Sequence, residues 1–330
     1  MLSQIGDNID NALIPGFDSV GFVNDEIRYK MIDTIVDNIA YDSVFVFSND
    51  ENNAVYRIRF AMVGHNNGNY VKSVSSANGR VFEWVAPING VPQGNYMPMR
   101  LIITPKKKQM ISFGGETNIA EKTILNYEFA LTNNDINTFS SRDSDDNIGT
   151  AFRINISQNI LSGKNNSLVT SAFFENTGQY FDAIEQYRSA EFSRDWNVDK
   201  ANAETNEYLA GLNLNFLNKK FGFADYKFNH MNRKSIYEGF QNQINTDIKY
   251  NNWHIKASGS LLNSDDLINS TMFLRHNVLI SKNINHLLFG ISELSENNVW
   301  SNLSKDTLRA NSFNFNEIKA FIRTNDSTKN

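Results

Sequence analysis

The chain has no cysteine, and it has only five histidines and five prolines among its 330 residues. Without thiols it can form neither a disulfide framework nor a thiolate metal site, so cysteine usage does not indicate a redox compartment. The histidines are scattered, and none stands in the HxxxH or HExxH spacing of a local zinc site. We therefore expect them in loops or on a wet strand face.

The sequence also lacks the common catalytic motifs. It contains no GxSxG elbow and no GxGxxG fingerprint, and SGKNNS at 162–167 lacks the upstream glycine of a phosphate-binding loop. The acidic pair Asp265-Asp266 could in principle serve glycoside hydrolysis, but adjacent residues on an extended chain point apart. The interpretation is a non-enzymatic protein with no cofactor and no nucleotide partner; a β-rich hydrolase using loop carboxylates is the least favoured hypothesis.

Charge and long hydrophobic runs are scarce as well. Only 20% of the residues are charged, the net charge is −5, and the one cationic run is 106–108, which argues against a nucleic-acid partner. This run fits a solvated strand edge or a lipid head-group contact. No stretch approaches the length of a membrane-spanning helix, and the first ten residues do not resemble a signal peptide. These features fit a cytosolic protein or an interior portion of a longer exported chain.

Asparagine makes up about 15% of the chain, against a typical usage of a few per cent. Its short amide competes for backbone hydrogen bonds and tolerates left-handed turn conformations, so it disfavours helix. We expect an all-β chain: an irregular lead-in over 1–40, a small antiparallel β-domain resembling a sandwich over 41–105, and longer β-hairpins over 106–330.

After Pro105, apolar and polar residues alternate in long runs of about nine to eleven residues, the length that a tilted strand needs to cross a bilayer. Alternation with a period of two places apolar side chains on one face of a strand and polar side chains on the other. We expect about ten or eleven antiparallel up-and-down strands, which leaves closure within this chain open. The residues that alternate with polar neighbours in five runs are Leu125, Tyr127, Phe129 and Leu131; Phe152, Ile154 and Ile156; Leu212, Leu214 and Phe216; Ala224, Tyr226, Phe228 and His230; and Trp253, Ile255 and Ala257.

The connections between these runs alternate in length, as in transmembrane barrels with short periplasmic turns and long outer loops. Aromatic residues also gather at the ends of runs, with Tyr250 and Trp253 around one turn and Phe221 and Phe223 around another, as in an interfacial girdle. The short connections lie near 118–122, 162–166, 218–222, 249–252 and 281–285, and the longer ones at 133–147, 176–206, 231–235 and 263–269.

Three segments resemble a family of large, poorly characterised outer-membrane β-barrel proteins from Bacteroidota. They are GNYVKSVSSANGRVFEWVAPINGVPQGNYMPMRLIITPKKKQM, FALTNNDINTFSSRDSDDNIGTAFRINIS and YRSAEFSRDWNV, and the resemblance runs from about residue 20 to the end. It implies that this chain corresponds to an interior portion of a longer barrel protein. The absence of a leader and of a closing strand is where the chain departs from the family, and the family provides no catalytic or ligand-binding residues to carry over.

Two places are weak candidates for ligand contact. Asp143, Asp145 and Asp146 resemble part of a calcium loop, but Ile154 stands where a bidentate glutamate belongs, so a solvated loop is favoured. Trp196, among the charges of YRSAEFSRDW, could stack on a sugar ring. The favoured interpretation is instead a strand whose Arg and Glu residues pair across a polar lumen, with Phe192 and Trp196 at the bilayer interface.

Together these observations predict a small β-domain followed by part of a transmembrane β-barrel in the outer membrane. The expected role is transport, export or surface assembly, with outer-membrane lipid and other envelope proteins as partners. The alternative is a soluble secreted β-sheet protein that binds glycans through exposed Trp and Tyr.

Overall fold

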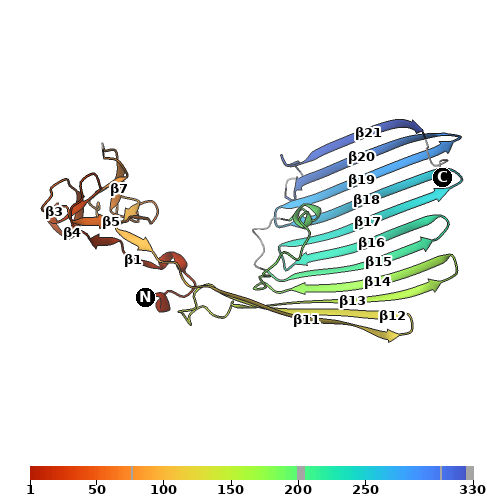
Figure 1. Ribbon diagram of the computed structural model, residues 1–330, viewed down its shortest axis with the longest axis horizontal. Helices are drawn as coiled ribbons and strands as arrows, with labels where there is room; N and C mark the ends of the chain where they lie inside the picture. The colour runs from red at the N-terminus through yellow and green to blue at the C-terminus, as the bar shows by residue number, and fades with distance from the viewer. Residues whose placement is uncertain (76, 199–204, 305–306, 325–330) are drawn as a thin grey trace. The chain divides into compact units, whose positions relative to one another are not determined.

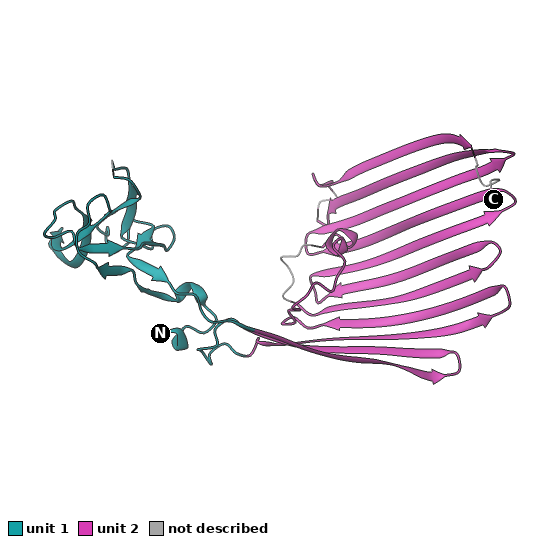
Figure 2. Ribbon diagram, in the orientation of Figure 1, with its two compact units in different colours: residues 1–107, 135–144 teal, residues 108–134, 145–330 magenta. Residues whose placement is uncertain are grey.

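The computed structural model describes residues 1–330 except 76, 199–204, 305–306 and 325–330. The chain divides into two compact units, coloured separately in Figure 2. Unit 1 comprises residues 1–107 and 135–144, and unit 2 comprises residues 108–134 and 145–330. The predicted all-β class is confirmed: a small sheet domain precedes a large antiparallel up-and-down sheet (Figure 1). None of the helices in the described part of the chain is long and apolar enough to span a membrane.

Unit 1 contains two four-stranded sheets, with strand orders β2-β5-β3-β4 and β6-β9-β7-β8, and a two-stranded sheet of β1 and β10. Two short 3-10 helices precede them, at Leu2–Gln4 and Ile9–Asn11. The strands are β1 (Leu13–Pro15), β2 (Phe17–Ser19), β3 (Tyr29–Val36), β4 (Ile39–Phe47), β5 (Tyr56–Ile58), β6 (Ala61–Met62), β7 (Tyr70–Ser73), β8 (Val81–Trp84), β9 (Tyr96–Met97) and β10 (Met99–Leu101).

The prediction that 1–40 is an irregular lead-in is wrong. β1, β2 and β3 all lie within it and belong to the sheets of unit 1. β1 and β2 have three residues each, and their partners lie far along the chain, since Phe17 pairs with Ile58 and Leu13 with Leu101. Strands this short show no periodicity of their own, so long-range pairing decides their structure.

Unit 1 is built as two tandem copies of one motif. The strand orders of its two four-stranded sheets match position by position: β2 corresponds to β6, β3 to β7, β4 to β8 and β5 to β9. The sequence carries the same signature, because FDSVG at 17–21 corresponds to FAMVG at 60–64. The pairing of Tyr29 with Tyr56 also corresponds to that of Tyr70 with Tyr96. Two equivalent half-domains therefore share one core.

Each copy gives a buried tyrosine to the other. The Tyr29 hydroxyl accepts a hydrogen bond from the backbone N–H of Phe82 at 2.9 Å, and the Tyr70 hydroxyl accepts one from that of Phe45, also at 2.9 Å. Around this pair, the rings of Phe60 and Phe82 stack with centroids 4.4 Å apart. Burial raises the pKa of Tyr29 from its usual value near 10 to about 12, and it raises the pKa of Tyr70 as well.

These raised pKa values make unit 1 sensitive to alkali. The unfolded chain releases the two phenolic protons as pH passes 10, while the folded state still holds them. The contribution of the two tyrosines to the free energy of unfolding is therefore fully present below pH 10 and is lost toward pH 12. We expect the free energy of unfolding of unit 1 to fall by an amount on the order of 2 kcal/mol between pH 10 and pH 12. Urea unfolding followed by Trp84 fluorescence, with a Trp84→Phe variant as background, measures it.

The control is the double variant Tyr29→Phe, Tyr70→Phe. It loses two buried hydrogen bonds, about 1–3 kcal/mol each, and is therefore less stable at neutral pH. Its stability should then change little between pH 10 and pH 12. An unchanged alkaline loss in the double variant would contradict the assignment to these tyrosines.

Unit 2 holds one sheet of eleven strands in sequence order from β11 to β21, in agreement with the ten or eleven expected. The unit boundary after Lys107 lies two residues from the expected position, and residues 135–144 return to unit 1. The strands are β11 (Lys107–Ala120), β12 (Thr123–Asp135), β13 (Ile148–Ser162), β14 (Asn166–Thr177), β15 (Glu207–Asn218), β16 (Gly222–Arg233), β17 (Tyr237–Tyr250), β18 (Trp253–Asp266), β19 (Asn269–Ile284), β20 (Leu287–Asn302) and β21 (Phe313–Thr324).

The register places the predicted apolar runs on one face of this sheet, here called the apolar face. The clearest row crosses β17 to β20, where an isoleucine of each strand pairs with the next one. In the described structure these side chains stay open to solvent, with exposed fractions between 37% and 60%. The four residues of this row are Ile248, Ile255, Ile280 and Ile291.

The other face, here called the polar face, carries cross-strand pairs of polar and charged residues. Glu207 of β15 pairs with Arg233 of β16, and Arg275 of β19 pairs with Glu296 of β20. The separation is incomplete, since His276 and Glu293 lie on the apolar face with their side chains 3.6 Å apart. A strand with one apolar and one polar face suits a boundary between two media.

The connections separate the two rims of the sheet. At one rim, the short-turn rim, five turns of two or three residues join the strands, at 121–122, 163–165, 219–221, 251–252 and 285–286. At the other, the long-loop rim, three connections are long, 136–147, 178–206 and 303–312, and two are short, 234–236 and 267–268. The predicted longer loops at 231–235 and 263–269 are thus wrong. Asp266 tightens the second of these turns by accepting hydrogen bonds from the backbone N–H groups of Ile268 and Asn269 at 2.7 Å.

Candidate functional site

The connection between β14 and β15 folds back over the polar face of the sheet. Its described part, residues 178–198, is here called the anchored segment, and Figure 1 shows it in green over the strand ends. The segment contains the short helix α1 (Phe192–Asp195). Its side chains contact the strands of this face through ion pairs, hydrogen bonds and a buried tryptophan, and it is the candidate functional site.

A left-handed residue ends α1 and fixes the direction of the chain after it. Asn197 has φ 50°, its N–H bonds to the carbonyl of Arg194 at 3.2 Å, and the N–H of Val198 bonds to the carbonyl of Ser193 at 2.9 Å. These two bonds make a Schellman motif, in which asparagine tolerates the left-handed conformation better than most residues. The motif turns Trp196 and Asn197 toward the sheet.

Trp196 is the apolar anchor of the segment. Its side chain is 4% exposed and packs in a cluster with Met231, Leu262 and Phe273 of the sheet. The Tyr237 hydroxyl, in the same cluster, donates a hydrogen bond to the Trp196 carbonyl. The cluster is a small hydrophobic seat on an otherwise polar face, and burial of a tryptophan there is worth several kcal/mol.

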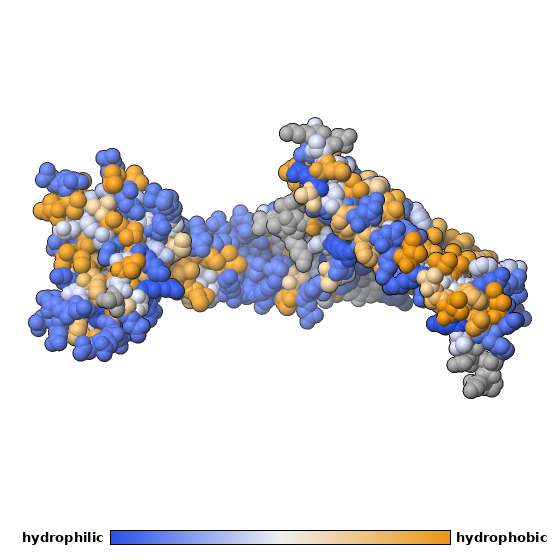
Figure 3. All heavy atoms as spheres, turned by 90° about the horizontal axis from the view of Figure 1, so that it is seen from above, coloured by the Kyte–Doolittle hydropathy of each residue, from blue (hydrophilic) through white to orange (hydrophobic). Residues whose placement is uncertain are grey.

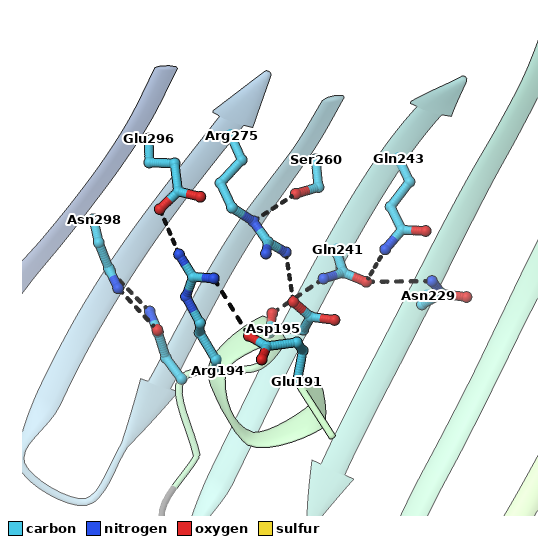
Figure 4. A network of polar contacts seen from close by, with 11 residues as sticks. Glu191, Arg194, Asp195, Asn229, Gln241, Gln243, Ser260, Arg275, Glu296 and Asn298 are labelled. Carbon is cyan, nitrogen blue, oxygen red and sulfur yellow. Dashed lines mark hydrogen bonds and ion pairs between the residues drawn. The ribbon is translucent and has the colours of Figure 1, made fainter. Parts of the chain in front are cut away.

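Two residues of α1 form ion pairs with the sheet (Figure 4). Arg194 contacts Glu296 of β20 at 2.5 Å, and Asp195 contacts Arg275 of β19 at 2.8 Å. Gln241 of β17 donates a hydrogen bond to the Asp195 carbonyl at 3.1 Å. Because Arg275 and Glu296 are also cross-strand neighbours, the helix places its two charges opposite two complementary charges of the sheet.

A second ionic cluster lies nearer the start of the sheet. The guanidinium of Arg188 contacts Glu175 of β14 at 2.6 Å and Glu207 of β15 at 2.5 Å. Arg233 of β16 contacts the other oxygen of Glu207 at 2.8 Å. The two carboxylates lie on neighbouring strands and are largely buried, so the cationic partners offset their mutual repulsion.

The contacts of the segment extend across the width of the sheet. At its start, Asp182 accepts from Lys108 of β11 at 2.6 Å and from Asn134 of β12 at 3.2 Å. At its end, Asn197 donates to Thr271 and Asn298 at 3.0 Å each. One connection therefore ties together strands from β11 to β20 on the polar face.

This geometry corrects the interpretation of YRSAEFSRDW. The region is a loop with a short helix, not a strand, because the Schellman motif and the contacts to the sheet determine its path. Trp196 is buried against the polar face, so it neither stacks on a sugar nor marks a bilayer interface on the apolar face. Arg188 and Arg194 do pair with carboxylates across the polar face, although those carboxylates come mainly from the sheet.

The three acidic residues that were a weak candidate for ligand contact lie in an exposed connection, in line with the favoured interpretation of a solvated loop. Asp143, Asp145 and Asp146 are exposed, with Asp143 in unit 1 and the other two in unit 2. Among the residues that the structure describes, no group of three or more His, Asp or Glu side chains is arranged to hold a metal ion. Asp266 serves the turn before β19.

The residues of the sheet that contact the anchored segment were not predicted from the sequence. Glu296, for example, lies 102 positions from Arg194 in the sequence. In the sequence, each sheet residue that contacts the segment is one more polar residue of an alternating strand. One local signal was available: Asn197 directly after Arg-Asp-Trp is a typical helix-ending residue.

The comparisons with known proteins leave the family open. No family model, curated protein or solved structure matches the chain.

Replacing Trp196 with alanine should release the segment. The substitution removes a buried side chain worth about 3–5 kcal/mol, so amide exchange of residues 188–198 should be at least about a hundredfold faster. Hydrogen-exchange mass spectrometry of the full chain measures this. The matched control is Tyr187→Ala, an aromatic residue of the same segment that is 56% exposed, which should change exchange little. Equal exchange in Trp196→Ala and the unmodified chain would show that Trp196 is not the anchor.

Proposed function

We propose that the chain forms part of the wall of an outer-membrane β-barrel that acts in transport, export or surface assembly. The observation that carries the proposal is the apolar face of the eleven-stranded sheet, whose isoleucine row and neighbouring large side chains stay exposed. Soluble monomers rarely expose contiguous apolar patches of more than a few hundred Å². In a lipid bilayer the same side chains would contact acyl chains and not water, so an apolar face of this size is stable there.

The dimensions of the strands agree with a bilayer. On β17 the residues of the apolar face run from Phe240 to Tyr250, about 34 Å along an antiparallel strand. At a tilt of about 45° this length spans roughly 24 Å, close to the apolar band of outer-membrane barrels. The polar face would then line a water-filled interior.

Aromatic residues at the short-turn rim support the placement of this rim at a membrane interface. The rings of Phe221 and Tyr250 lie 5.5 Å apart, and the Lys282 ammonium lies 4.6 Å from the Trp253 ring centroid. Aromatic rings with adjacent lysines are typical of the membrane interface. With short turns on the periplasmic side, the long-loop rim would face outward.

The anchored segment would narrow the interior of such a barrel. It lies on the polar face and contacts strands from β11 to β20. A connection held there by ion pairs and one aromatic anchor would restrict the passage of solutes, as inward-folded loops do in some barrels.

Further strands would be needed to complete the wall. β11 and β21 are the edges of the sheet in the part of the chain that the structure describes. Because eleven antiparallel strands put the first and the last in the same direction, antiparallel closure requires an odd number of additional strands. This agrees with the even strand numbers of bacterial barrels.

A pair of neighbouring substitutions on β17 tests the proposal. Ile244 lies on the apolar face and Asn245 on the polar face, and both are exposed. We expect Ile244→Arg to weaken insertion of the full chain into lipid vesicles by about 2–4 kcal/mol, the cost of a guanidinium near the bilayer midplane. Asn245→Arg should insert like the unmodified chain. Flotation of vesicles after dilution from urea measures the bound fraction.

The soluble glycan-binding alternative makes the opposite prediction. In that case the unmodified chain would stay in solution without detergent and would not float with vesicles, and the two arginine variants would behave alike. That outcome would refute the barrel proposal.

A further inference from the structure

An apolar groove of about 970 Å³ lies beside the short-turn rim on the apolar face of the sheet. Its walls come from β18 to β21, and Figure 3 shows hydrophobic residues, in orange, gathered toward one end of the sheet. Ala320 lies between larger neighbours and pairs with Ile291 across β20 and β21, so its small side chain leaves room for a ligand. The large apolar side chains of the groove include Val278, Ile280, Ile284, Phe289, Ile291 and Ile322.

A cation and an indole ring close the groove at the rim. The Lys282 ammonium lies 4.6 Å from the centroid of the Trp253 ring, and both residues line the groove. Lys282 is half-buried and forms no ion pair with any carboxylate in the described part of the chain. The other charged lining residue, Glu293, already faces His276 at 3.6 Å. The groove thus has an apolar length and one available positive charge at its rim end.

We propose that this groove binds one acyl chain of an anionic phospholipid, with the lipid phosphate at Lys282. The proposal rests on the proposed membrane function, because it needs the apolar face to lie in a bilayer. The apolar walls match an acyl chain, and the ammonium at the rim matches a phosphate at head-group depth. A zwitterionic lipid fits less well, since its own cation would face Lys282.

Quenching of Trp253 fluorescence by brominated lipids tests this directly. The full chain is inserted into phosphatidylcholine vesicles containing a minor fraction of phosphatidylglycerol, with one of the two lipids brominated at a time. The difference between the unmodified chain and Trp253→Phe isolates the signal of Trp253 from those of the other three tryptophans. We expect phosphatidylglycerol to be enriched about fivefold beside Trp253 over its bulk share, the effect of one lysine at an anionic head group.

Two variants of similar chemistry give the control. Lys282→Gln should reduce the enrichment to about onefold. Lys220→Gln should leave it unchanged, because Lys220 also lies beside an aromatic ring at the short-turn rim, 5.2 Å from the centroid of Phe221, but does not line the groove.

The outcomes separate this proposal from the one on which it rests. Quenching without enrichment of phosphatidylglycerol, or enrichment that survives Lys282→Gln, would overturn the groove proposal and leave the membrane proposal standing. The absence of Trp253 quenching by either brominated lipid would overturn the membrane proposal itself.

Discussion

The alternation of side chains along the strands of unit 2, interrupted in β13 by a register shift between Asn159 and Leu161, is the constraint on which the rest of the structure depends. Register transmits this alternation from strand to strand, so Ile248, Ile255, Ile280 and Ile291 form one row although they lie on four strands. A shift of a single residue in any pairing would move the stripe of that strand to the opposite face. The sheet therefore keeps one mainly apolar and one mainly polar face, and both proposals follow from this separation.

The anchored segment is a consequence of the polar face. A face that carries Glu175, Glu207, Arg275 and Glu296 has charges that need partners, and Arg188, Arg194 and Asp195 provide them. Ion pairs of this kind contribute more to geometry than to stability, since desolvation offsets much of their attraction. The apolar contact of Trp196 supplies the burial that holds the segment, and the ion pairs set its position.

The sequence predicted unit 2 better than unit 1, for a physical reason. Long alternating runs such as 212–216 carry their own period, so the strands and their apolar face could be predicted without knowing their partners. The strands of two or three residues in unit 1, and the duplication that relates 17–21 to 60–64, depend on pairing across the domain. The hydrophobic cluster around Trp196 could not be predicted either. Leu262 and Phe273 lie on strands far from Trp196 in the sequence and resemble ordinary strand residues.

The most direct test of the account uses the absence of native cysteine, which allows one spin label at a time on β17. Single cysteines are placed at each position from 242 to 248, beyond Gln241 and its contact with the anchored segment, in the full chain inserted into vesicles. Collisions with oxygen and with a water-soluble nickel complex are compared. The account predicts oxygen maxima at even positions, on the apolar face, and nickel maxima at odd positions, on the polar face. Collision rates without a period of two, or with the two faces exchanged, would contradict it.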